Sequence, residues 1–65
     1  MANNISIPRG KRVHYEDDLV RVYDDNGKVV YQGMLDYCPY KYDNYVWNEK
    51  EQCYDLPHGY KMIGV

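Results

Sequence analysis

The sequence predicts an all-β protein, either a small antiparallel sheet or a partly closed barrel of about five short strands. Apolar and polar residues alternate with period two in Leu19–Tyr23, whereas no window shows the three-and-four apolar spacing of a helix. Tyrosine, valine and aspartate are frequent where a helix would favour alanine, leucine and glutamate. Asn26-Gly27 follows the first alternating run and is a strong short-range signal for a hairpin.

The first predicted hairpin joins Leu19–Tyr23 to a long return strand, Lys28–Tyr37, through Asn26-Gly27. A loop of this kind sets the register, and the register sets which side chains share a face. The predicted core face carries the apolar members of both strands: Val20, Val22, Val29, Tyr31, Leu35 and Tyr37.

Asn26-Gly27 as a two-residue loop predicts three specific cross-strand pairs. Asp25 is expected opposite Lys28, Val22 opposite Tyr31, and Val20 opposite Gly33. A glycine in the middle of a strand favours a bulge or a sharp bend, so we expect the long strand to bend at Gly33.

The rest of the chain predicts shorter elements around polar or proline-containing turns. Cys38-Pro39 ends the long strand, because proline cannot donate to a sheet ladder. The remaining expected elements are a strand Tyr45–Asn48, its hairpin partner Gln52–Leu56, a turn Pro57-His58-Gly59, a last strand Tyr60–Ile63, an opening strand Arg12–Tyr15 and a loose arm Met1–Pro8. The order of these elements from Leu19 to Val65, with the strand bent through Gly33, resembles the SH3-like and Sm-like small barrels.

Length and composition limit what the chain can do. Its 65 residues form one domain, 1–65, with a small core. The net charge of −2 disfavours nucleic acid as a partner, because nucleic-acid binders usually have a basic excess. No apolar run approaches membrane-spanning length, and the N-terminus lacks the apolar core of a secretory signal. We therefore expect a cytoplasmic protein, either monomeric or a homodimer.

Nine tyrosines and one tryptophan, without any phenylalanine, indicate rings that have one apolar and one wet edge. Such rings are typical of binding surfaces. We expect Tyr31, Tyr37 and Trp47 to face the core. We expect the outward-facing tyrosines, which would contact a partner, to be Tyr40, Tyr42 and Tyr45.

The carboxylates of the first half form an acidic block that follows a basic start at Arg9, Lys11 and Arg12. This block consists of Glu16, Asp17, Asp18, Asp24 and Asp25. One interpretation is a solvated surface with turn-forming aspartates. The other is a surface that steers the chain towards a basic partner.

Two histidines and two cysteines provide the ligand types of a structural zinc site: His14, Cys38, Cys53 and His58. Zn²⁺ would stabilise a core this small. The sequence lacks the closely spaced cysteine and histidine pairs of a zinc finger, so two alternatives stay open. The cysteines are either buried and free, or joined as a Cys38–Cys53 disulfide in an oxidising compartment.

We expect no catalysis. Ser6 is the only serine, threonine is absent, and a Cys53–His58 dyad would need a cleft that so short a chain hardly allows. In size and composition the chain resembles the small phage-encoded inhibitors of host enzymes, including anti-CRISPR proteins. That resemblance implies a protein of the host cytoplasm that binds a larger nucleic-acid-processing enzyme and blocks a basic functional surface. The alternatives are a barrel that binds single-stranded nucleic acid, and a zinc-stabilised module of a larger complex.

Overall fold

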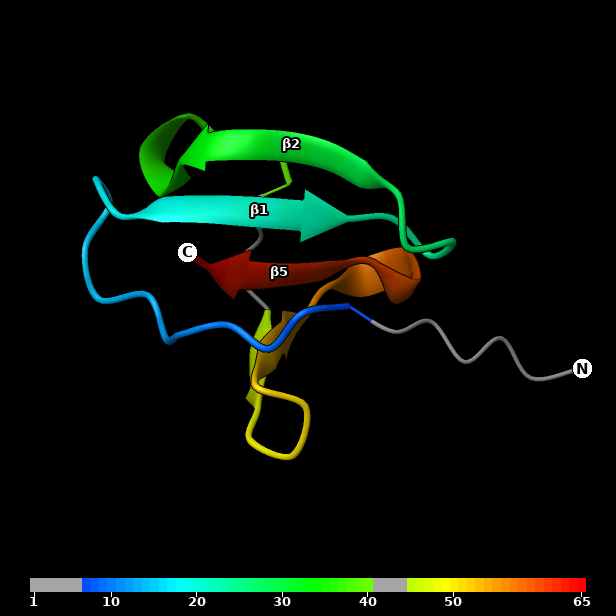
Figure 1. The fold of residues 1–65 in the computed structure, drawn as a ribbon. Coiled ribbons are helices and arrows are strands. Elements are labelled where there is room, and N and C mark those ends of the chain that lie inside the picture. Colours follow the sequence, from blue (N-terminus) through cyan, green and yellow to red (C-terminus); the bar gives the residue numbers. More distant parts are fainter. Residues whose placement is uncertain (1–6, 41–44) are drawn as a thin grey trace, which may run out of the picture.

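A computed structural model describes residues 7–40 and 45–65. They form one antiparallel sheet with the strand order β2-β1-β5-β4-β3 (Figure 1). Its strands are β1 (Leu19–Tyr23), β2 (Val29–Met34), β3 (Val46–Asn48), β4 (Cys53–Asp55) and β5 (Lys61–Gly64). Two single-turn 3₁₀ helices, η1 (Leu35–Tyr37) and η2 (Pro57–Gly59), follow β2 and β4. The all-β prediction is confirmed, and of its two forms the open sheet is the one observed.

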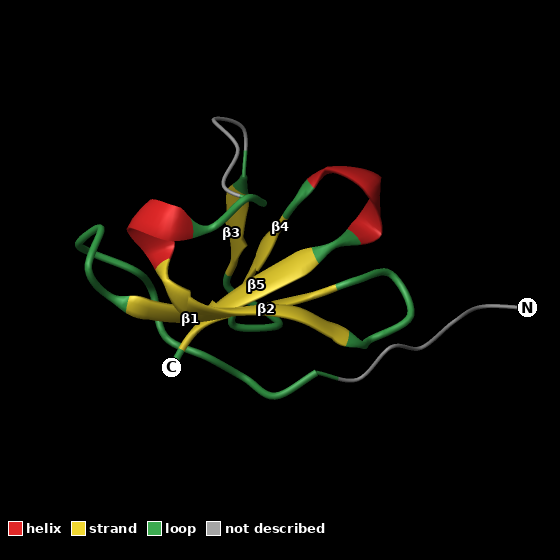
Figure 2. Cartoon of the chain, turned by 90° about the horizontal axis from the view of Figure 1, so that it is seen from above, coloured by secondary structure: helices red, strands yellow, loops and turns green. Residues whose placement is uncertain are grey.

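The β3–β4 hairpin turns away from the layer formed by β2, β1 and β5 (Figure 2). The hairpin turns away because two segments share the outer edge of β5. β4 pairs with the first half of β5, at Lys61 and Met62. Near the end of β5, Gly64 pairs instead with Lys11, in a bridge whose two N–H···O bonds measure 3.0 and 3.1 Å. We call residues 7–13 the strap, because this segment crosses from one side of the sheet to the other.

The two faces of the sheet bury different clusters, as period-two alternation requires. The larger cluster contains Val20, Val22 and Met62 from the central strands and is completed by Leu35, Cys38, Tyr54 and Leu56. The smaller cluster, on the opposite face, consists of Tyr23, Cys53 and Ile63, with Ile7 of the strap packed against it. Of the predicted loose arm, residues 1–6 lie outside the described residues, whereas Ile7 contacts the core.

The predicted pairs Val22–Tyr31 and Val20–Gly33 are both observed. The hairpin loop is held by the Asp24 side chain, which accepts hydrogen bonds from the backbone N–H groups of Asn26 (2.9 Å) and Lys28 (2.8 Å). Gly27 has φ of 83°, which glycine adopts without strain. Asn26-Gly27 therefore belongs to a longer loop that an aspartate organises. The predicted Asp25–Lys28 pair is wrong, because the Asp24 N–H donates to the Lys28 carbonyl at 2.8 Å.

The predicted bulge occurs at a different residue. Val22 pairs with Tyr31 and the next residue, Tyr23, pairs with Val29, so Val30 is the extra residue of the bulge. Gly33 lies in regular pairing. Its importance is steric, because a Cβ there would lie 2.8 Å from the Tyr31 hydroxyl, which donates a 2.7 Å hydrogen bond to the Met34 carbonyl.

Two members of the predicted core face are exposed instead. Val29 is 45% exposed because the bulge moves it to the face of Tyr23. Tyr37 is 72% exposed because the chain leaves β2 at Met34 and the turn of η1 breaks the alternation. The expected opening strand, Arg12–Tyr15, is wrong: these residues form no strand, and the nearest pairing is the single bridge at Lys11 before them.

Candidate functional site

The loop before β1 is closed by the side chain of Asp18. Asp18 Oδ2 accepts hydrogen bonds from the backbone N–H groups of His14 (2.9 Å) and Tyr15 (3.1 Å). The backbone N–H of Asp18 donates in turn to the Tyr15 carbonyl at 3.1 Å. The two bonds to the carboxylate lower the pKa of Asp18, because they stabilise its charged form. The Asp18 carboxylate therefore stabilises the conformation of its own loop.

This loop is bonded to two other segments of the chain. The Leu35 N–H donates to the Asp18 carbonyl at 2.9 Å, and the Asp36 N–H donates to the Glu16 carbonyl at 2.8 Å. On the other side, the Val65 N–H donates to the Leu19 carbonyl at 3.0 Å. The loop, η1 and the segment after β5 are thus held together at one end of the sheet, where β1 begins (Figure 1).

Most of the exposed apolar surface lies at this end. The large hydrophobic side chains that are exposed in the described residues are Tyr15 (70%), Leu19 (53%), Val29 (45%), Tyr37 (72%), Val46 (62%) and Val65 (44%). Three of the six lie in the three bonded segments, together with three exposed carboxylates, and Leu19 begins β1 directly after the loop. We call this set the end patch: Tyr15, Glu16, Asp17, Leu19, Asp36, Tyr37 and Val65.

The structure divides the predicted acidic block between two ends of β1. Glu16 and Asp17 lie in the loop before the strand, whereas Asp24 and Asp25 lie in the hairpin loop after it. Five residues of strand separate these ends by about 17 Å. Asp18 and Asp24 bind backbone N–H groups of their own loops, as turn-forming aspartates do. The block is therefore two separate acidic surfaces.

The tyrosines expected to face outwards are partly covered. Tyr40 packs on Tyr60 with ring centroids 5.5 Å apart, and Tyr45 packs edge-on against Tyr54 at 5.2 Å. Both are half-buried against the larger core cluster, so the outward orientation predicted for them is wrong. Tyr42 lies outside the described residues. Tyr40 and Tyr45 pack inwards because the core of this short chain is small, and the rings around Tyr54 enlarge it.

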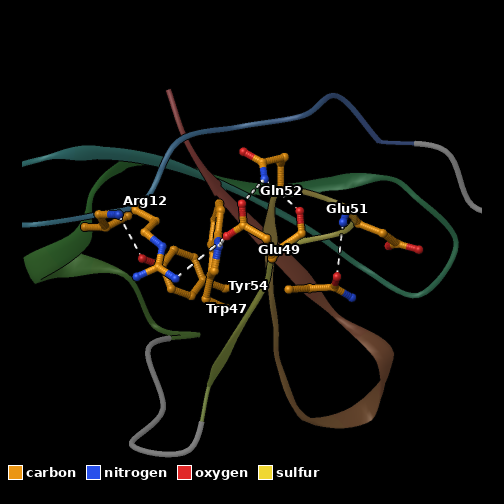
Figure 3. A network of polar contacts seen from close by, with 8 residues as sticks. Arg12, Trp47, Glu49, Glu51, Gln52 and Tyr54 are labelled. Atoms are coloured by element: carbon orange, nitrogen blue, oxygen red, sulfur yellow. Dashed lines mark hydrogen bonds and ion pairs between the residues drawn. The ribbon is translucent and has the colours of Figure 1, made fainter.

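A network around Trp47 holds the strap against the β3–β4 hairpin (Figure 3). The Arg12 guanidinium lies over the indole of Trp47, 5.2 Å from its centroid. Trp47 Nε1 donates to Glu49 Oε1 at 2.8 Å, and Gln52 Nε2 donates to Glu49 Oε2 at 3.1 Å. These two bonds, the Trp47 bond above all, lower the pKa of Glu49. Trp47 also packs edge-on against Tyr54, 4.9 Å away.

The four predicted zinc ligands are spread over the molecule. Cys38 belongs to the larger core cluster and Cys53 to the smaller one on the opposite face, and both are free thiols. His14 and His58 are exposed. Within residues 7–40 and 45–65, no group of three His, Cys, Asp or Glu side chains is arranged to hold a metal ion. The zinc hypothesis stays a prediction that native mass spectrometry with and without a chelator tests.

Burial also governs the chemistry of Cys53. Desolvation raises the pKa of its thiol, which disfavours the nucleophilic thiolate at neutral pH. His58 is exposed in the turn of η2, with φ of 65°. The burial of Cys53 and the exposure of His58 are those expected of a cysteine that packs in the core.

Five members of the end patch were missed from the sequence: Tyr15, Leu19, Asp36, Tyr37 and Val65. One signal was present, because Tyr15 directly precedes the acidic run Glu16-Asp17-Asp18. The exposure of Tyr37 and the approach of Val65 to Leu19 depend on tertiary structure.

Comparison of the chain with protein-family models, curated protein sequences and solved structures finds no match. Among the residues that the structure describes, no helix is long and apolar enough to cross a membrane.

Proposed function

We propose that this chain is a non-catalytic protein-binding module that docks through its end patch onto a basic surface of a larger protein. One observation supports this most strongly. Four of the six exposed large hydrophobic side chains and three exposed carboxylates lie at the end of the sheet where β1 begins, where backbone hydrogen bonds hold the chain segments together.

The composition of the end patch suits an interface. Apolar and aromatic side chains in the middle of a contact supply most of its binding energy, and tyrosine is one of the residues that dominate hot spots. Tyr15 and Tyr37 provide two such rings, each at least 70% exposed. Because the loop before β1 is held by the Asp18 carboxylate and by η1, little conformational entropy is lost when a partner binds.

The charge of the end patch favours a basic partner. Glu16 and Asp17 extend from the ordered loop, and their field would steer a basic surface towards the tyrosines. Carboxylates in this position would also replace nucleic-acid phosphates on the partner and release its counterions. This is the basis for proposing an inhibitor that covers the basic functional surface of a nucleic-acid-processing enzyme.

A photo-crosslinking experiment tests the proposal. A photoreactive amino acid is placed at Tyr37 or, as a matched control, at Val46, which is similarly exposed but lies on β3. Each protein is irradiated in an extract of its source cell, and the adducts are identified by mass spectrometry. We expect the Tyr37 position to capture a basic protein at low salt but not at high salt, and the Val46 position not to capture it. Equal capture at both positions, or none at Tyr37, would contradict the proposal.

Binding of single-stranded nucleic acid is the second candidate function. It is favoured by the Arg12 guanidinium stacked on Trp47 and by two exposed basic neighbours, Arg9 and Lys11. Arginine and aromatic side chains of this kind stack on bases and contact phosphates. Retention of a labelled oligonucleotide at low salt, weakened by Arg12→Gln, would support this function over the first.

A further inference from the structure

β2 is the least protected edge of the sheet. Among residues 7–40 and 45–65, it pairs with β1 alone, and Figure 1 shows it as the outermost strand of its layer. It is the longest strand, with six residues, and it contains neither a charged residue nor a proline. The strand at the opposite end of the sheet, β3, has only three residues, and the outer edge of β5 is covered by β4 and the strap. Proteins usually block an edge by shortening, charging, bending or covering it, and β2 has only the bulge at Val30.

The hydrogen bonds beside β1 show which backbone groups of β2 point outwards. In an antiparallel pair, the N–H and C=O of one residue point to the same side, and this side alternates along the strand. The Asp18 carbonyl accepts from the Leu35 N–H, so the backbone of Asp18 points to the β2 side, and so does that of Val20 two residues on. Val20 lies opposite Gly33, whose backbone therefore points back to β1. The N–H and C=O of the neighbouring Gln32 consequently point away from the sheet.

Gln32 is the centre of this open edge. It is exposed and lies within the regular pairing that runs from Tyr31 to Met34. Its side-chain Oε1 accepts from Arg21 Nε at 2.9 Å, which holds the side chain towards β1. At the end of the edge, the Met34 carbonyl already accepts the 2.7 Å hydrogen bond from the Tyr31 hydroxyl. A strand added to β2 would therefore form its central pair of backbone hydrogen bonds with Gln32.

A second copy of the chain fits this edge in the antiparallel direction. Two identical antiparallel strands are related by a two-fold axis, so Gln32 of one copy can lie opposite Gln32 of the other. Lys28 and Asp36 are each four residues from Gln32 and lie just outside β2, one before it and one after it. Both are exposed, and antiparallel pairing brings Lys28 of each copy to the end of β2 where Asp36 of the other lies. Parallel pairing would instead place like charges together.

We propose that the protein forms a symmetric dimer in which two β2 strands pair antiparallel about Gln32. The two five-stranded sheets then become one continuous sheet. Because the contact is narrow, the dimer is weak and forms as the protein concentration rises. The hairpin loop with Asp25 of one copy lies at the same end as the end patch of the other, so the dimer gathers acidic surfaces that β1 separates within one chain. The dimer does not depend on the proposed function, which requires the end patch of one chain only.

Charge-swap variants of Gln32 test the position of the axis. Gln32→Lys places two lysines opposite each other in the dimer and Gln32→Glu places two glutamates there, whereas an equimolar mixture places lysine opposite glutamate. Sedimentation equilibrium measures the dimer dissociation constant from micromolar to millimolar concentration for the wild type, each variant and the mixture. Val46→Lys and Val46→Glu are the matched controls, because Val46 is exposed on β3, the strand at the other end of the sheet. Circular dichroism verifies that each variant is folded.

We expect the wild type to dimerise, each Gln32 variant alone to dimerise about tenfold more weakly, and the mixture to recover most of the wild-type affinity. Recovery in the mixture cannot come from a change in fold, because it contains the same two chains. The Val46 variants should dimerise like the wild type. A wild type that stays monomeric at millimolar concentration, or a mixture that dimerises no more tightly than the separate variants, would overturn the inference. Capture of a basic protein at Tyr37 would then still support the proposed function, since that crosslink needs no second copy.

Discussion

Replacing Gly64 with alanine tests whether the strap contributes to the stability of the sheet. An alanine Cβ at this position would lie 2.6 Å from the Lys11 carbonyl oxygen and 3.3 Å from its carbon. Both are backbone atoms, so relief of the clash requires the strap to move. The movement breaks the two hydrogen bonds of the Lys11–Gly64 bridge and strains the 2.8 Å bond from the Val13 N–H to the Tyr54 hydroxyl.

The expected magnitude follows from these bonds. Each contributes about 1 kcal/mol net, so breaking two and straining the third costs about 2–3 kcal/mol. Alanine loses less backbone entropy on folding than glycine, which offsets roughly 0.5–1 kcal/mol. The net loss is about 2 kcal/mol, equivalent to a fall in Tm of about 8–16 °C for a domain of this size. Strand propensity alone predicts the opposite sign, because alanine normally stabilises a strand relative to glycine.

Urea denaturation followed by circular dichroism measures the difference. Gly33→Ala is the matched control, because its Cβ would meet the Tyr31 hydroxyl, the movable end of a side chain. We expect the control to lose about 1 kcal/mol or less, through the Tyr31–Met34 hydrogen bond. If Gly64→Ala is as stable as the wild type, the reasoning about the strap is refuted.

Three further predictions concern the charges and thiols. Arg12→Lys keeps the charge but loses the stacking on Trp47, so we expect a loss of about 0.5–1 kcal/mol in denaturation and altered fluorescence of this single tryptophan; an unchanged spectrum would contradict the contact. The lowered pKa of Asp18 stabilises the fold above the carboxyl's unfolded value of 3.8, and this contribution is lost as pH falls through the folded pKa. Stability measured against pH should therefore decline on acidification, less steeply in Asp18→Asn, and equal slopes would oppose this explanation. Cys38 and Cys53 are buried and should react with a thiol reagent only after unfolding; fast labelling of the native protein would contradict their burial.

Local sequence patterns were sufficient for the elements whose determinants are close in the chain. β1 begins and ends at the predicted residues, because alternation and the following loop define both of its ends. The pairs Val22–Tyr31 and Val20–Gly33 were predicted from a two-residue loop and are observed because the extra residue Val30 compensates for the longer loop. The β3–β4 hairpin was predicted for the same reason, since its turn is only four residues long.

Tertiary structure decided the features that depend on distant contacts. The bulge at Val30 moved Val29 to the other face, and the segment before β1 pairs with β5 only at Lys11, ahead of the expected strand Arg12–Tyr15. The acidic residues were adjacent in sequence but were separated by β1, because a strand carries its ends apart. Conversely, Leu19 and Val65 are far apart in sequence and were joined by the β1–β5 pairing. The sequence alone thus determined an all-β chain rich in tyrosine and acid, whereas packing decided which of these side chains are exposed and which are brought to the same end of the sheet.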